Sequence, residues 1–321
     1  MTQHNPGAAI AANGLRKSYG DHVVLDGVDL DIPSGTVFSL LGPNGAGKST
    51  VVKILSTLIG ADGGQARVLG HDVATEPEAV RTAIGVTGQY SAVDGLLTGH
   101  ENLMLMAKLN RLGQADANRR ATELLERFDL VDAAGKTAAT YSGGMRRRLD
   151  LAMTLVGEPR LIFLDEPTTG LDPRSRRDMW QTIRDLVDDG VTVFLTPQYL
   201  EEADQLADRI AVLDHGAIVA QGTAAELKRR VPGGHVRLRF TEAEALESAA
   251  RALGGEADTD VLALKVPGNG GVASLRELLE RLDTEAIHPE ELSVQTPALD
   301  DVFLALTGSR RADDNARKAN R

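Results

Sequence analysis

The feature that most constrains this chain is a nine-residue segment that satisfies G-x-x-x-x-G-K-[ST] at every fixed position. It reads Gly42-Pro43-Asn44-Gly45-Ala46-Gly47-Lys48-Ser49-Thr50. An apolar run at residues 36–41 precedes it, and residues 51–59 carry apolar side chains at helical spacing. The sequence therefore predicts a strand, a glycine-rich turn and a helix, in which backbone N–H groups and the positive end of the helix face an anion. The alternative, an ordinary turn with a surface lysine, is disfavoured by these flanks.

Two polar side chains of this segment have expected roles toward a nucleoside triphosphate. Lys48 can reach the β- and γ-phosphates, and the Ser49 hydroxyl can bind Mg²⁺. All nine residues are candidate nucleotide ligands. A triphosphate site is shared by many kinds of protein, so the function has to come from the rest of the chain.

Composition excludes several classes of protein. The 321 residues provide for one large domain and a smaller one, and 42% of them are hydrophobic, which is enough for a sizeable core. The absence of cysteine excludes disulfides, zinc fingers, iron–sulfur clusters and thiol nucleophiles. A net charge of −11 argues against a nucleic-acid partner. No apolar run approaches the ~20 residues that span a bilayer, and residues 1–9 show no secretion signal, so we expect any membrane contact to require a partner.

The order of apolar segments predicts an α/β fold with a mostly parallel sheet covered on both faces. Buried β-runs at residues 160–164 and 191–196 alternate with helical patterns. Two short strand-like runs, Ala9–Leu15 and Val23–Leu30, predict an antiparallel β layer ahead of the glycine-rich segment. Helical spacing from about residue 90 to 157 predicts a helical subdomain within a domain covering residues 9–231. Residues 1–8 are expected to be disordered.

A second domain is expected after the turn at residues 232–234. Residues 232–308 have the order β-α-β-β-α-β of a ferredoxin-like α+β domain, followed by a terminal helix. The polar residues 309–321 are expected to be disordered. One apolar face of the terminal helix suggests a regulatory or dimer-stabilising role, although packing on its own domain is an equal alternative. This face consists of Leu299, Val302, Phe303 and Leu306.

A pair of acids ends the buried run at residues 160–164. Asp165 is a candidate Mg²⁺ ligand, bound through water. Glu166 is a candidate general base that polarises an attacking water. The alternative is a turn carboxylate that caps the next helix. Because the pair follows a phosphate-binding segment, the sequence favours the catalytic interpretation.

A third motif, Ser142-Gly143-Gly144, stands at the start of a predicted helix shortly before Asp165. Glycines at a helix start expose N–H groups that suit an anion. A plain helix N-terminus with Ser142 as the N-cap is the alternative. The motif is weak by itself, and its place before the acidic pair strengthens it.

Together these motifs resemble the ATP-binding subunit of an ABC transporter, over about residues 10–225. The similarity rests on the glycine-rich segment, Gln89, Ser142-Gly143-Gly144, Leu164-Asp165-Glu166-Pro167 and Gly170-Leu171-Asp172. More narrowly, the chain is similar to the daunorubicin-resistance subfamily of drug exporters. That similarity rests on Gly88-Gln89-Tyr90, the stretch Gln198–Asp204 and Leu299-Asp300-Asp301-Val302-Phe303-Leu304. The subfamily also has a small C-terminal domain.

The resemblance implies ATP and Mg²⁺ as ligands and assigns further roles. Tyr19 would stack on adenine, where the alternative is a turn tyrosine. Gln89 would sense Mg²⁺ and the attacking water and act as a hinge, where the alternative is a surface glutamine. Asp172 would lie at a dimer interface near the partner's ATP, where the alternative is an N-cap before Pro173. The residues implied to contact ATP of the opposite subunit are Ser142, Gly143, Gly144, Met145 and Asp172.

Two positions depart from the family pattern. Met145 and Tyr141 stand where glutamine and leucine are usual, and both positions tolerate change. Gln198 stands where the family has a switch histidine after the strand at residues 191–196. Because the drug-exporter subfamily shares this glutamine, we interpret Gln198 as a variant catalytic residue. The alternative is a loop residue that points away.

The resulting hypothesis is an ATPase that forms a head-to-tail homodimer at the cytoplasmic face of the cell membrane. It would drive a separate integral-membrane permease that exports a hydrophobic drug or secondary metabolite. One rival is a soluble ABC ATPase acting on DNA or the ribosome. Such proteins carry two cassettes, zinc modules or long coiled coils, and this chain has one cassette and no sustained heptads. A second rival is a drug-sequestering protein that uses ATP structurally, against which the intact Glu166 argues.

Overall fold

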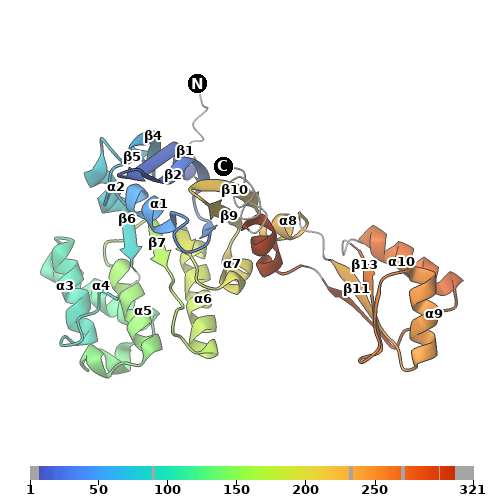
Figure 1. Cartoon of the computed structure of the whole chain (residues 1–321). Coiled ribbons are helices and arrows are strands. Elements are labelled where there is room, and N and C mark those ends of the chain that lie inside the picture. Colours follow the sequence, from blue (N-terminus) through green and yellow to red (C-terminus); the bar gives the residue numbers. More distant parts are fainter. Residues whose placement is uncertain (1–6, 89–90, 231–233, 269–271, 296, 308–321) are drawn as a thin grey trace. The chain divides into compact units, whose positions relative to one another are not determined.

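The computed structural model describes residues 7–88, 91–230, 234–268, 272–295 and 297–307 (Figure 1). The chain divides into two compact units, Met1–Ala224 and Ala225–Arg321. The division lies at helix α8 (Ala224–Lys228), which the sequence did not suggest, and the expected boundary at 232 lies outside the described residues. None of the described helices is long and apolar enough to cross a membrane.

A six-stranded sheet organises the first unit, in the order β10-β9-β3-β8-β7-β6. The pairs β9–β3, β3–β8, β8–β7 and β7–β6 are parallel, and only β10 runs antiparallel to its neighbour β9. The strands are β3 (Val37–Leu41), β6 (Ile84–Thr87), β7 (Leu161–Asp165), β8 (Thr192–Thr196), β9 (Arg209–Asp214) and β10 (Ala217–Gly222). The mostly parallel sheet is therefore confirmed.

A four-stranded antiparallel sheet, in the order β2-β1-β4-β5, forms a second layer of this unit. Its strands are β1 (Ala8–Tyr19), β2 (His22–Pro33), β4 (Gly63–Val68) and β5 (His71–Asp72). The expected strands Ala9–Leu15 and Val23–Leu30 were too short, because register shifts let β1 and β2 continue past positions where the pairing slips. Gly14, at φ 59°, lies at one such shift. β1 also begins inside the stretch 1–8 that was expected to be disordered.

Among the helices of the first unit, α3, α4 and α5 gather at one end, away from the antiparallel sheet (Figure 1). This group is the expected helical subdomain. The helices are α1 (Lys48–Leu55), α2 (Pro77–Ala83), α3 (Gly99–Leu109), α4 (Gln114–Arg127), α5 (Gly143–Thr154), α6 (Pro173–Asp188) and α7 (Leu200–Leu206), with short 3₁₀ turns η1 (Val131–Ala133) and η2 (Ala138–Thr140).

Alternate side chains of the parallel strands enter two separate cores. Ile162 and Leu164 of β7 pack in a cluster with α3–α6, whereas Leu161 and Phe163 pack in a cluster with α1 and the antiparallel sheet. In the second cluster Phe194 lies between Phe38 and Phe163, at centroid distances of 5.4 and 5.3 Å. The sheet is thus buried on both faces, which fixes the register of its strand ends.

The second unit contains the sheet β12-β13-β11-β14, in which all neighbours are antiparallel. Its elements are β11 (His235–Arg239), α9 (Ala243–Leu253), β12 (Glu256–Asp258), β13 (Ala263–Pro267), α10 (Val272–Thr284) and β14 (Glu291–Gln295). This is the expected ferredoxin-like order. Residues 299–307 are helical, with Leu299 and Val302 buried.

The three contacting phenylalanine rings give a stability prediction. Phe194→Ala should lower the free energy of unfolding by about 3–5 kcal/mol, because it leaves a cavity between two rings. Urea unfolding followed by circular dichroism would measure the loss. Leu58→Ala is the control, because Leu58 is 66% exposed, and it should change stability by less than about 0.5 kcal/mol. Equal effects of the two substitutions would contradict this account of the core.

Candidate functional site

The glycine-rich segment turns from β3 into α1 with a backbone that only glycine tolerates at two points. Gly45 and Gly47 have φ values of 82° and 109°. A Cβ atom on Gly47 would lie 2.7 Å from Leu25 Cδ2 and 3.0 Å from the Val24 oxygen. A Cβ atom on Gly42 would collide with the Leu213 carbonyl oxygen. The loop therefore packs closely against β2 and β9, as a cradle for phosphate requires.

Lys48 folds back over this loop. Its Nζ donates hydrogen bonds to the carbonyl oxygens of Gly42 at 2.5 Å and Pro43 at 3.1 Å. Burial lowers the pKa of Lys48, and the nearby Glu166 and Asp165 carboxylates oppose that shift. The ammonium group thus lies between the loop and the acidic pair. Ser49 is exposed in the first turn of α1, so its hydroxyl can reach a ligand on the loop.

The two acids stand at the carboxyl end of β7. Asp165 Oδ1 accepts a hydrogen bond from Thr196 Oγ1 at 2.5 Å. Glu166 leaves the strand in a left-handed conformation, with φ 49°, and its N–H donates to the Thr196 carbonyl at 2.9 Å. The Asp165 carboxylate is therefore held by the neighbouring strand β8, whereas the backbone of Glu166 departs from the extended conformation of a strand. Oxygen donors of Ser49 and Asp165 match what Mg²⁺ prefers.

The structure brings Gln198 and Glu166 to a shared partner. Thr169 Oγ1 donates to Gln198 Oε1 at 2.7 Å and lies 3.3 Å from Glu166 Oε2. The hydroxyl has one proton, so it donates to one of these oxygens at a time. Sequence reasoning missed Thr169 and Thr196. Thr196 ends β8, and Thr169 lies four residues after the end of β7. Their position at the carboxyl ends of neighbouring parallel strands is the sequence signal that could have identified them.

The Ser142 motif begins α5 as an N-cap. Ser142 Oγ accepts from Met145 N at 3.2 Å, so the alternative given for this serine is present in the structure. Asp172 likewise caps α6, through Arg174 N, Ser175 N and the Ser175 hydroxyl. These bonds lower the pKa of Asp172, the Ser175 hydroxyl most strongly. Neither cap excludes a contact with a second subunit, which stays a prediction for both.

Gly143 and Glu166 of the same chain line one hollow of about 260 Å³, together with Thr169 and Gly170.

Tyr19 ends β1 and is 52% exposed, with Lys17 Nζ 5.6 Å from its ring centroid. Tyr19 lies at the hairpin between β1 and β2, and residues Val24 and Leu25 of β2 lie next to Gly47. The ring is therefore accessible to an adenine ring, and stacking on adenine stays a prediction. Gln89 lies outside the described residues.

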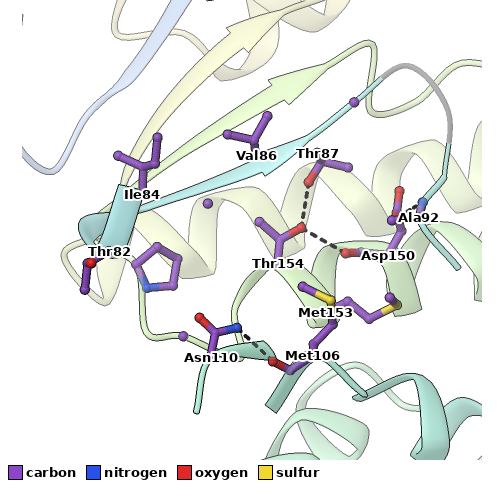
Figure 2. A pocket seen from close by; sticks show the side chains of 14 residues that line it. Thr82, Ile84, Val86, Thr87, Ala92, Met106, Asn110, Asp150, Met153 and Thr154 are labelled. Atoms are coloured by element: carbon purple, nitrogen blue, oxygen red, sulfur yellow. Dashed lines mark hydrogen bonds between the residues drawn. The ribbon is translucent and has the colours of Figure 1, made fainter. Parts of the chain in front are cut away.

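A second hollow, of about 170 Å³, lies beside the edge strand β6 (Figure 2). Thr87 of β6 hydrogen-bonds Thr154 of α5 across it, at 2.9 Å. Asp150 Oδ1 accepts from Ala92 N at 3.0 Å at its rim. Met106 of α3 and Asn110, which caps the carboxyl end of α3, complete the opposite wall (Figure 2). Residues of the parallel sheet and of the helical subdomain therefore line this hollow together, with Gly88 and Ala92 among them.

A fully buried carboxyl lies behind the loop that carries Thr169. Glu202, in the first turn of α7, is 0% exposed. Neither of its oxygens has a hydrogen-bond partner among the described residues, and the same holds for Thr168 Oγ1 and Trp180 Nε1. Burial raises the pKa of Glu202 to about 7, and the Thr168 hydroxyl, the Trp180 indole and the Arg176 guanidinium act in the opposite direction. Sequence reasoning missed this group.

Comparison with known proteins identifies the family. Residues 25–169 match the family model described as ABC transporter. The daunorubicin resistance ATP-binding protein DrrA3 of Streptomyces coeruleorubidus is 50% identical over 306 residues, which cover 94% of this chain and 97% of the relative. The chain belongs to the ABC transporter ATP-binding family. The daunorubicin/doxorubicin resistance protein DrrA of Streptomyces peucetius is 49% identical, over 98% of this chain and 97% of the relative.

Solved structures agree with this assignment. An ATP-binding subunit of an ABC transporter is 28% identical, with a TM-score of 0.62, over 69% of this chain and 92% of that one. A dimeric post-hydrolysis state of the cassette MJ0796, bound to ADP and Pi, is 27% identical, with a TM-score of 0.60, over 67% of this chain and 98% of that one. The chain is therefore an ABC ATPase that binds ATP, and the resemblance to drug-resistance ATP-binding subunits is confirmed.

The contacts of Gln198 support a test of its role. Gln198→Ala should lower ATP turnover by about tenfold or more, or about 1.4 kcal/mol of barrier, with ATP affinity little changed. Gln198→His should preserve turnover, because histidine also offers a donor and an acceptor. Steady-state ATPase assays with separately measured nucleotide affinity decide this. Wild-type turnover in the alanine variant would show that Gln198 is only a loop residue.

Glu202 gives a prediction of pH dependence. A carboxyl with a raised pKa in the folded chain stabilises the fold fully below its unfolded pKa of 4.5, and this contribution is lost as pH rises through about 7. Glu202→Gln removes the titration, so the stability of the wild type relative to this variant should fall by roughly 2–3 kcal/mol between pH 5 and pH 8. Urea unfolding at both pH values measures it. Parallel pH profiles would refute the raised pKa.

Proposed function

We propose that this ABC ATPase energises the export of a hydrophobic drug or secondary metabolite through a separate membrane permease. The observation that carries the catalytic part is the convergence of Lys48, Asp165, Glu166 and Gln198 at the carboxyl ends of β3, β7 and β8. The choice of cargo is supported by the names of relatives, including daunorubicin resistance proteins and the linearmycin resistance protein LnrL of Bacillus subtilis, which is 36% identical. These names favour a transporter over an ATPase acting on DNA or the ribosome.

Within one chain, each residue of the site has a separate task toward ATP. The loop from Gly42 to Thr50 holds the phosphates through backbone N–H groups, and Lys48 exchanges its loop carbonyls for phosphate oxygens. Ser49 and Asp165 would hold Mg²⁺, which supplies positive charge at the phosphates when bound. Glu166 accepts the proton of the attacking water, and Gln198 orients that water.

We propose a homodimer as the working form. Ser142, Gly143 and Gly144 would contact the γ-phosphate on the opposite subunit with the N-terminus of α5. Among the described residues, no hydrogen bond joins this motif to the phosphate-binding loop of its own chain, which agrees with a role toward a partner. The dimeric cassette MJ0796 supports the arrangement by analogy. ATP binding would close the dimer and hydrolysis would reopen it.

The permease would meet the chain at the cytoplasmic face of the membrane. The hollow beside β6 is the surface we propose for this contact, since residues of the sheet and of the helical subdomain both line it (Figure 2). Val86 on the edge strand lines the hollow and is an exposed apolar side chain, and Met106 of α3 lines it as well. A docked permease segment would therefore touch both parts of the cassette at once.

Two substitutions test the catalytic assignment. Lys48→Ala should abolish ATP binding, because it removes the cation aimed at the phosphates. Glu166→Gln should bind ATP normally but lose turnover, and it should accumulate an ATP-bound dimer, because the base is lost while the cradle remains. A fluorescent ATP analogue, an ATPase assay and gel filtration measure the three quantities. Normal turnover in Glu166→Gln would refute the assignment of the base.

A further inference from the structure

Arg147 of α5 makes an unusual set of contacts around the catalytic glutamate. Its Nε donates to the Pro167 carbonyl at 2.8 Å, and its Nη2 donates to the Asp165 carbonyl at 3.1 Å. The guanidinium group thus holds the two peptide carbonyls that flank Glu166. Only 13% of the Arg147 side chain is exposed. A fork of fixed donors on two carbonyls restricts the backbone between them.

The sheet leaves these carbonyls without a strand partner on this side. β6 pairs with β7 only as far as Thr87, which lies opposite Leu164. Beyond that point Arg147 supplies the donors that the edge strand does not. A simple structural explanation is therefore that Arg147 caps the end of β7. These bonds have a second consequence. Because Arg147 holds the carbonyls on both sides of Glu166, it also holds the left-handed backbone of that residue, at φ 49°, and so the direction in which its side chain leaves the backbone.

A third bond ties the same guanidinium group to the segment after Gln89. Arg147 Nη1 donates to Asp150 Oδ2 at 3.0 Å, while Asp150 Oδ1 accepts from Ala92 N at 3.0 Å. Asp150 is 3% exposed. Two neighbouring turns of α5 therefore connect the start of the helical subdomain to both sides of Glu166, through buried charge-assisted hydrogen bonds.

We propose that Arg147 is a positioning residue for ATP hydrolysis, which holds the backbone on both sides of Glu166 so that its carboxylate meets the attacking water. Asp150 keeps the guanidinium group in place. The inference rests on the proposed role of Glu166 as the base. It predicts an effect on the chemical step and not on nucleotide binding, because Arg147 has no contact with the phosphate-binding loop among the described residues.

The test compares two arginines of α5 in the full-length chain. Arg147→Ala should lower kcat by about tenfold or more, because small displacements of a catalytic group are costly, while affinity for a fluorescent ATP analogue stays within about twofold. Arg147→Lys should be intermediate, since the three donors of an ammonium group leave from one atom and do not reproduce the planar fork that reaches two carbonyls and a carboxylate. Arg148→Ala is the matched control. Arg148 also bonds a carbonyl and a carboxylate, those of Phe128 and Asp129, and this variant should retain wild-type kcat.

A double-mutant cycle separates positioning from general stability. In a Glu166→Gln background, single-turnover hydrolysis of γ-labelled ATP should fall by less than about twofold on adding Arg147→Ala, because the group being positioned is already gone. The proposal would be overturned if the effects of Glu166→Gln and Arg147→Ala on hydrolysis were fully additive. It would also be overturned if kcat were unchanged in Arg147→Ala, or if weaker ATP binding explained the loss of activity. If Arg147→Ala does not fold, Arg147→Lys is judged by the same criteria. Wild-type turnover in Glu166→Gln would instead refute the base, and this outcome is distinguishable from failure of the positioning role alone.

Discussion

The proposed catalytic groups meet because β3, β8 and β7 are hydrogen-bonded neighbours in one parallel sheet. Parallel neighbours end at the same edge, so the loops after Leu41, Asp165 and Thr196 open on one side. The register is fixed by burial on both faces, since a shift by one residue would exchange the two cores. The positions of Lys48, Glu166 and Gln198 therefore depend on packing inside the two cores, including the contacts of Phe194 with Phe38 and Phe163.

The sequence was informative where chemistry and periodicity coincide. The phosphate-binding loop, the acidic pair, the alternating β-runs and the β-α-β-β-α-β order of the second unit all follow from local patterns. It was less informative where partners are distant in the chain. Thr169 and Arg147 act through contacts with β7 and β8, and nothing in their own neighbourhoods specifies those contacts. The lengths of β1 and β2 were underestimated because the apolar runs end at Leu15 and Leu30, whereas the two strands continue to Tyr19 and Pro33.

Glu166 combines a demanding task with an unfavourable backbone. A non-glycine residue in the left-handed region costs roughly 1–3 kcal/mol, which the surrounding structure has to offset. On one side the Thr196 carbonyl accepts its N–H, and on the other Arg147 holds the adjacent carbonyls. These contacts come from β8 and from α5, so the backbone at Glu166, the proposed base, is held jointly by the sheet and by the helical subdomain. A movement of α5 relative to the sheet would therefore change the geometry of this proposed base.

The two buried carboxyls near this loop illustrate how the same burial leads to different behaviour. Burial raises the pKa of both Asp150 and Glu202. Asp150 has the Ala92 amide and the Arg147 guanidinium as partners, which favour its charged form and make it a structural link. Around Glu202 the Thr168 hydroxyl, the Trp180 indole and the Arg176 guanidinium favour the charged form, but burial outweighs them and favours the neutral carboxyl. Hydrogen bonds of Asp150, in α5, thus link it to Arg147 and Ala92, while a carboxyl of α7 whose pKa is about 7 is buried near Thr168 and Trp180.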